Sequence, residues 1–138
     1  MDSLDKDARA LLARPLTAVI GTINASGAPH AVPVWFNFGG DGIEIWADTS
    51  RLWVKNLQRE PRCSVTVAEH EAPFAAVLIR GTAAVRSGDT SEIHAAARRI
   101  TARYIPAGEV DAYVNQWASL DAVVHIRPEI VRGWGRGF

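Results

Sequence analysis

The sequence has little cysteine and no excess of charge of either sign, and both shortages exclude classes of protein. Cys63 is the single cysteine among 138 residues, so the chain cannot form an intrachain disulfide. Lysine plus arginine and aspartate plus glutamate both number 15, which gives a formal net charge of zero at pH 7. A neutral chain has no overall field that attracts DNA, RNA or an anionic membrane, so we expect neither nucleic-acid nor membrane partners.

Long apolar runs and catalytic motifs are also missing. No hydrophobic run approaches the roughly 18 residues of a membrane helix. The N-terminus is acidic and has no signal-peptide core, so we expect a cytoplasmic protein. No nucleophile elbow, P-loop or dinucleotide-binding glycine pattern is present, and this leaves catalytic residues unassigned. No metal site is predicted, because metal-ligand spacing is absent among His30, His70, His94 and His125.

What is present predicts one mainly β domain over residues 1–138. Hydrophobic residues make up 48% of the chain, which is enough for a core. Cys63 lies in an apolar, strand-like run and is expected to be a buried small hydrophobe. Segments rich in β-branched and aromatic residues predict six strands, the first three forming an antiparallel meander, at 16–23, 30–38, 43–47, 62–69, 74–86 and 122–132.

Helical spacing of apolar residues predicts helices at 4–13, 51–59, 90–104 and 109–117. Six strands with helices inserted late favour a closed or nearly closed β-barrel with peripheral helices. The strand segments 32–36 and 74–79 are apolar on both faces. Apolar groups on the outside of a barrel need cover, which predicts a homodimer, although packed helices could supply part of that cover.

The most informative segment for chemistry is the start of the predicted helix 51–59. Thr49 and Ser50 place two hydroxyls there, and Arg51 and Lys55 are four residues apart on one helix face. Hydroxyls, free backbone N–H groups and two cations together suit a phosphate. The alternative is a capped surface helix with solvated charges.

Two further segments are candidates for ligand contact. Pro33 cannot donate a ladder hydrogen bond, so its strand is interrupted or lies at a sheet edge, where a ligand could rest against the backbone. A simple edge proline is the alternative. Near the C-terminus, glycines flank Trp134 and could let its indole approach a ligand closely, or the segment is a frayed end.

The ordered combination of several segments resembles the pyridoxamine 5′-phosphate oxidase-like split-barrel superfamily. The resemblance is closest to its flavin/deazaflavin oxidoreductase branch, many of whose members use coenzyme F420. The resembling segments cover nearly the whole chain. They are Leu11–Pro15, Gly21–Thr22 with Gly27–His30, Val32–Phe36, Lys55–Leu57 with Glu60–Arg62, Arg80–Gly81, and Ile126–Glu129 with Gly133–Trp134.

This resemblance implies a six-stranded antiparallel split β-barrel of the FMN-binding type that dimerises, with two cofactor sites between the subunits. The cofactor ring is implied to lie against the second strand, at Val32, Pro33, Val34 and Trp35. The cofactor phosphate is implied to be held by Thr49, Ser50, Arg51, Lys55 and Asn56. Groups that reach the cofactor of the other subunit are implied at Trp134 and, by a looser match, Arg136.

One departure from the family bears on the cofactor. Relatives often carry two adjacent basic residues where this chain has Leu52 and Trp53, so the phosphate site is expected to be weaker or shifted. The resemblance implies an F420-dependent oxidoreductase that passes hydride to a small, fairly apolar acceptor, with FMN as the alternative cofactor. A non-catalytic cofactor or haem carrier is a second class, with His30 or His70 as the candidate axial ligand.

Overall fold

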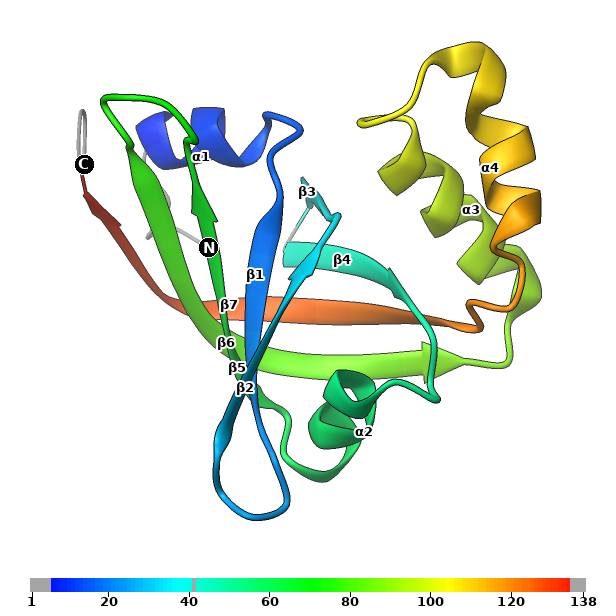
Figure 1. Cartoon of the computed structure of the whole chain (residues 1–138), viewed down its shortest axis with the longest axis horizontal. Helices are drawn as coiled ribbons and strands as arrows, with labels where there is room; N and C mark the ends of the chain where they lie inside the picture. The colour runs from blue at the N-terminus through cyan, green and yellow to red at the C-terminus, as the bar shows by residue number, and fades with distance from the viewer. Residues whose placement is uncertain (1–5, 41, 135–138) are drawn as a thin grey trace.

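The computed structural model describes residues 6–40 and 42–134, and the fold is mainly β (Figure 1). Strands and helices of the described residues follow one another as α1 (Lys6–Leu12), β1 (Ala18–Ile23), β2 (Pro29–Val34), β3 (Asn37–Gly39), β4 (Gly42–Ala47), α2 (Leu52–Arg59), β5 (Arg62–Ala68), β6 (Ala76–Ser87), α3 (Thr90–Thr101), a 3₁₀ turn (Ala107–Glu109), α4 (Val110–Gln116) and β7 (Ala122–Trp134).

The strands form one antiparallel sheet in the order β2-β1-β5-β6-β7-β4-β3. This sheet curls into a half-barrel around its core (Figure 1). Alternate residues of the strands face inward, and Ile20, Val65, Ile79 and Ile126 are almost completely buried. The expected antiparallel barrel-type architecture is therefore confirmed, whereas the sheet of the described residues has seven strands rather than the six predicted.

The extra strand arises because the predicted strand 30–38 breaks in the middle. β2 pairs with β1 and β3 pairs with β4, so the two halves lie at opposite edges of the sheet. The predicted three-strand meander is therefore wrong. Phe36 lies in the break, where its backbone bonds to side chains instead of a strand: its carbonyl accepts from Arg103 at 2.6 Å and its N–H donates to the Tyr104 hydroxyl at 3.3 Å.

A bulge in the pairing of β6 with β7 explains how a proline fits inside a central strand. Arg80 is opposite Ile130 and Gly81 is opposite Pro128, which leaves Glu129 as the additional residue. The two backbones approach closely there, since a Cβ on Gly81 would lie 2.3 Å from the Arg127 carbonyl oxygen. Gly81 is thus a glycine because the bulged strand occupies the space of a side chain.

We expect Gly81→Ala to lower the free energy of unfolding by roughly 2–3 kcal/mol, since the methyl group would push β7 away. Gly108→Ala is the control, because nothing lies within 4 Å of a Cβ at that position. Urea denaturation of the two variants and the parent measures the difference. Equal stability of the two variants would contradict the close approach.

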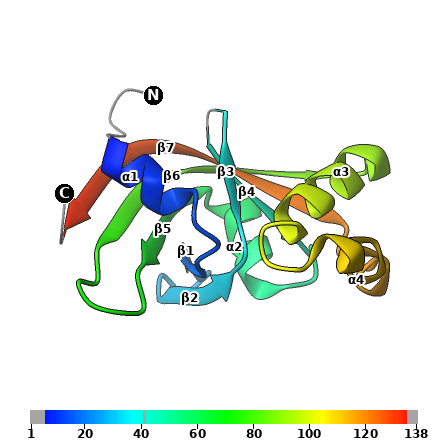
Figure 2. The same cartoon turned by 90° about the horizontal axis from the view of Figure 1, so that it is seen from above.

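The helices cover different parts of the half-barrel. α1 buries Ala8, Leu11 and Leu12 in the main core, as its spacing predicts. α3 and α4 pack against each other at the far end of β6 and β7, away from α1 (Figure 2). Among the described residues, no helix has the length and apolar character to span a membrane.

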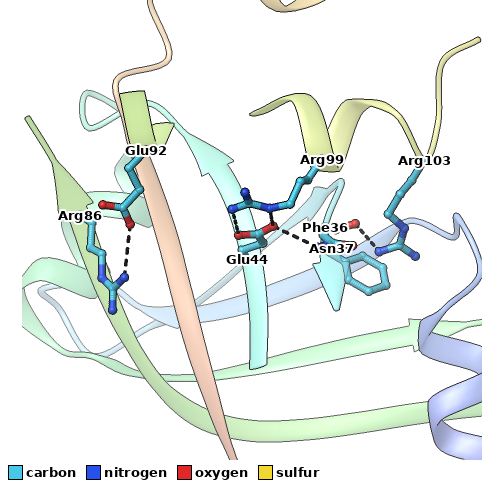
Figure 3. A network of polar contacts seen from close by, with 7 residues as sticks. All are labelled: Phe36, Asn37, Glu44, Arg86, Glu92, Arg99 and Arg103. Atoms are coloured by element: carbon cyan, nitrogen blue, oxygen red, sulfur yellow. Dashed lines mark hydrogen bonds and ion pairs between the residues drawn. The ribbon is translucent and has the colours of Figure 1, made fainter. Parts of the chain in front are cut away.

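An ion pair ties α3 to β4. Arg99 donates from Nε and from one Nη to the two carboxylate oxygens of Glu44, at 2.9 and 3.0 Å, and Asn37 donates to the same carboxylate at 3.0 Å (Figure 3). Glu44 is buried, which by itself raises the pKa of its carboxyl group. The hydrogen bonds from Arg99 and Asn37 and the charge of Arg99 outweigh burial, so the pKa lies below its ordinary value.

This lowered pKa predicts a loss of stability in acid. A carboxyl group whose pKa is depressed by folding stabilises the native state above its unfolded pKa of 4.5, and the contribution disappears as the pH falls below that value. We expect the free energy of unfolding to fall more steeply from pH 5 to about pH 3 in the parent than in Glu44→Gln. Parallel curves from urea titrations at several pH values would contradict this role of Glu44.

Candidate functional site

A cleft of about 550 Å³ opens between β2, β4, the start of α2 and the helices α3 and α4. Most of its wall is apolar or aromatic, and the charged or titratable side chains among its described residues are those of His30, Asp48, Arg51 and Tyr113. The apolar and aromatic wall includes Val32, Pro33, Val34, Trp35, Trp46, Leu52, Trp53, Tyr113 and Trp117. Such a wall suits a planar organic ring.

β2 supplies one side of the cleft and is the edge strand of the sheet. Pro33 pairs with Val19 of β1, and no strand of the described residues pairs with the other side of β2. The expectation that Pro33 marks a sheet edge is therefore confirmed. The four residues expected to contact a ring, Val32 to Trp35, all line the cleft. Their contact with a ligand stays a prediction.

Trp35 belongs to a column of aromatic rings that joins β2 to the helices. Its indole stacks on Tyr104 with ring centroids 4.6 Å apart and on Tyr113 at 5.4 Å, and Tyr113 contacts Trp117 at 6.3 Å. Two tyrosine rings thus stack on the indole and hold Trp35 against the helical end of the molecule.

The start of α2 differs from the expected hydroxyl cradle. Arg51 occupies the N-cap position and makes no side-chain cap bond, so the predicted hydroxyl cap is wrong. The Ser50 hydroxyl donates to Asp48 at 2.7 Å, and Thr49 donates to Asp121 through its N–H at 2.9 Å and its hydroxyl at 2.7 Å. These bonds lower the pKa of both carboxyl groups, so two negative charges lie beside the helix start at neutral pH.

The three remaining residues of the predicted phosphate site lie in different surroundings. Arg51 lines the cleft, and its side chain is exposed. Lys55 is exposed on α2, outside the residues that line the cleft. Asn56 is buried, and its amide donates to the Thr22 hydroxyl at 3.1 Å and to Asn24 at 2.9 Å. The amide of Asn56 thus fastens α2 to β1 and the turn after it.

The C-terminal candidates give less information. The backbone of Trp134 pairs with Ala76 at the end of β7, and Arg136 lies outside the described residues.

Of the histidines, His30 lines the cleft, whereas His70 is exposed between β5 and β6. No group of three potential metal ligands occurs among residues 6–40 and 42–134. Cys63 is only partly buried, contrary to expectation, yet loss of solvent raises the pKa of its thiol to about 12, so the thiol stays protonated at neutral pH.

Sequence reasoning did not assign Tyr113 and Asp121 to the site. Tyr113 presents its ring to the cleft, and burial raises the pKa of its hydroxyl, which therefore keeps its proton at neutral pH. Asp121 reaches Thr49 across 72 residues of sequence. The only local signal was the aromatic spacing of Tyr113 and Trp117 on the predicted helix 109–117, which does not reveal the direction those rings face.

Comparisons with known proteins agree with this architecture. Residues 4–135, nearly the whole chain, match the protein family described as "Pyridoxamine 5′-phosphate oxidase". A search of curated proteins returned no match.

Among solved structures, an F420 reductase superposes with a TM-score of 0.73 and 18% identity, over 94% of this chain and 98% of the other. A conserved hypothetical protein from Mycobacterium tuberculosis gives a TM-score of 0.81 at 20% identity, over 97% and 87% of the two chains. The haem storage protein HutZ from Vibrio cholerae gives 0.74 at 16% identity, over 98% and 96%. These similarities establish the fold.

Proposed function

We propose a function on the premise that this chain belongs to the pyridoxamine 5′-phosphate oxidase family. The chain is a cofactor-dependent oxidoreductase that holds the ring of a flavin or deazaflavin in the cleft beside β2. Coenzyme F420 is the preferred cofactor and FMN the alternative. The observation that carries the proposal is the apolar and aromatic cleft between Val32–Trp35 on one side and Arg51 on another.

The cleft fits the ring of such a cofactor. Its volume of about 550 Å³ lies within the usual range for small-molecule sites, and its wall is largely apolar. The free edge of β2 lets a ring approach the backbone closely, as a regular inner strand would not. When bound, the cofactor supplies the hydride chemistry, while the chain positions the ring and limits its contact with water.

Fewer residues are available to bind the acidic end of the cofactor than the family resemblance implies. Thr49 and Ser50 already donate to Asp121 and Asp48, and those two carboxylates repel an added anion. Arg51 and Lys55 remain, since neither makes an ion pair within the part of the chain that the structure describes. Arg51 at the cleft and Lys55 one turn further along α2 are therefore the proposed contacts of the phosphate.

Substrate would enter the same cleft and meet the aromatic wall. Tyr113 and Trp117 line this cleft, and their rings would favour a small, fairly apolar acceptor. The hydroxyl of Tyr113 has no hydrogen-bond partner within the described residues and keeps its proton, so it is available to donate to such an acceptor.

A second copy of the chain is proposed to cover the outer face of the sheet. The exposed fractions of Val19, Ile23 and Ile130 on that face are 42%, 39% and 41%. Exposed apolar side chains gathered on one face are typical of an interface. Sedimentation equilibrium measures the expected dimer mass.

Lys55→Ala should weaken binding of F420 or FMN by about tenfold, or ~1.4 kcal/mol, because a charge-assisted phosphate contact is lost. The control is Gln58→Ala, an exposed position on the same helix. Fluorescence titration of both variants with each cofactor measures the change. Equal affinities in the two variants would show that the phosphate lies elsewhere.

Haem binding is a second candidate function, favoured by the position of His30. This half-buried histidine lines the cleft, as His70 does not. The structural similarity to HutZ points the same way. A haem absorption band after reconstitution that disappears in His30→Ala would support this function in place of the oxidoreductase.

A further inference from the structure

A second hollow, of about 720 Å³, lies over the strands β2, β1, β5 and β6. One rung of the sheet crosses it: Ala31 is opposite Gly21, Gly21 is opposite Ser64, and Ser64 is opposite Arg80. Paired residues of neighbouring strands share a face. The four side-chain positions therefore lie on the outer face, because the alternate residues of these strands, such as Ile20 and Val65, are buried in the core.

Glycine and serine shape the floor of this groove. A Cβ on Gly21 would lie 2.6 Å from the Ser64 hydroxyl oxygen, so the serine side chain leans across the glycine. That hydroxyl is accessible and has no hydrogen-bond partner among the described residues. The groove therefore contains a serine hydroxyl that is free to bind a ligand and that lies over the backbone of Gly21.

Positive charge borders the floor on one side. Arg80 is exposed and makes no ion pair within residues 6–40 and 42–134, unlike Arg14, Arg86, Arg98, Arg99 and Arg127, each of which pairs with an acid. Arg62 also lines the groove, and its one acidic partner is Glu60, at 2.6 Å. No carboxylate is among the described residues that line this groove, in contrast to the two carboxylates beside the start of α2.

His30 connects the groove to the cleft, since it lines both. A ligand whose ring occupies the cleft could therefore extend an acidic group past β2 into the groove. In a dimer formed through the outer face, the second copy would cover this group and shield it from water.

We propose that the groove is an anion subsite, in which Arg80 and the Ser64 hydroxyl bind a phosphate or carboxylate and Arg62 adds positive charge. The anion is carried by the ligand of the cleft, and that part of the inference rests on the proposed function. The subsite supplies a free hydroxyl beside a cation, whereas the hydroxyls at the start of α2 already donate to Asp121 and Asp48.

Inorganic phosphate is the first probe, added at constant ionic strength to the ¹⁵N-labelled protein and followed by NMR. We expect saturable shifts centred on the amides of Gly21 and Ser64, with affinity lowered by about fivefold or more in Arg80→Gln. The control is Arg132→Gln, which removes a charge from an exposed position on β7. Shifts that are absent from the groove, or unchanged in Arg80→Gln, would overturn the subsite.

The second arm identifies the source of the anion. Fluorescence titration with F420 and FMN is expected to show weaker binding to Arg80→Gln by a similar factor. If Arg80→Gln binds both cofactors as the parent does while losing phosphate, the anion does not come from the cofactor and that part of the inference is wrong. If phosphate binds the groove and neither cofactor binds the protein, the subsite stands and the proposed function fails.

Discussion

Replacing Arg51 with glutamate should weaken binding of F420 or FMN by about thirtyfold, or ~2 kcal/mol. Arg51 is the cation that lines the cleft at the start of α2, so the change removes an attraction and adds a repulsion. Asp48 already lies close by, and a second negative charge would make the rim of the cleft unfavourable for any phosphate. The effect should shrink as salt is added, because Arg51 is exposed.

The fold should tolerate this change. Arg51 is the N-cap of α2 and makes no side-chain cap bond, and a negative charge at a helix N-terminus interacts favourably with the helix dipole. Arg132→Glu makes the same change of charge at an exposed position on β7, outside the cleft. Equal loss of affinity in both variants would mean that overall charge, and not a contact of Arg51, governs binding.

Replacing Arg103 with alanine should lower the free energy of unfolding by about 3–4 kcal/mol. Its guanidinium donates to three backbone carbonyls, those of Phe36 at 2.6 Å, Leu12 at 3.0 Å and Arg14 at 2.6 Å. It also lies 4.6 Å from the centre of the Phe36 ring (Figure 3 shows the pair). Removing it takes a donor from each of these carbonyls at the junction of α1, the β2–β3 break and the end of α3. Among the described residues, the carbonyls of Phe36 and Arg14 then keep only the Tyr104 hydroxyl and the Leu16 N–H, respectively.

Two further variants separate this role from charge alone. Arg103→Lys should recover only part of the stability, because an ammonium group cannot reproduce the planar fork of donors. Arg98→Ala, on the exposed side of α3, should cost less than about 1 kcal/mol, since a surface ion pair contributes little. Guanidinium denaturation of all three compares them, and a similar loss in Arg98→Ala and Arg103→Ala would contradict the argument. Because Phe36 follows Trp35, we also expect Arg103→Ala to weaken ligand binding.

Local sequence patterns predicted most of the elements for identifiable reasons. The β-branched run from Ala18 to Ile23 is a strand, and the spacing of Ala97 and Ile100 marks the buried face of α3. Pro33 correctly indicated a sheet edge. The break at Trp35 and Phe36 was not predictable locally, because both residues favour strands. Their conformation is set by Arg103 and Tyr104, which are distant in the sequence.

The candidate site shows the same division between local and distant causes. The family resemblance implied Val32 to Trp35, the charge at a helix start indicated Arg51, and all of these residues line the cleft. Sequence reasoning did not show that Asp121 would take the donors of Thr49, or that two tyrosine rings would stack on Trp35. Those contacts depend on how α3 and α4 pack against the sheet.

A cofactor titration of the unmodified protein tests the central claim, that the cleft beside β2 binds the ring of a flavin or deazaflavin. Trp35, Trp46, Trp53 and Trp117 line the cleft, so a bound ring should quench tryptophan fluorescence. We predict saturable quenching by F420 or FMN with a dissociation constant below about 100 μM, equivalent to roughly −5.5 kcal/mol. Failure of both cofactors to bind at that concentration would contradict the assignment.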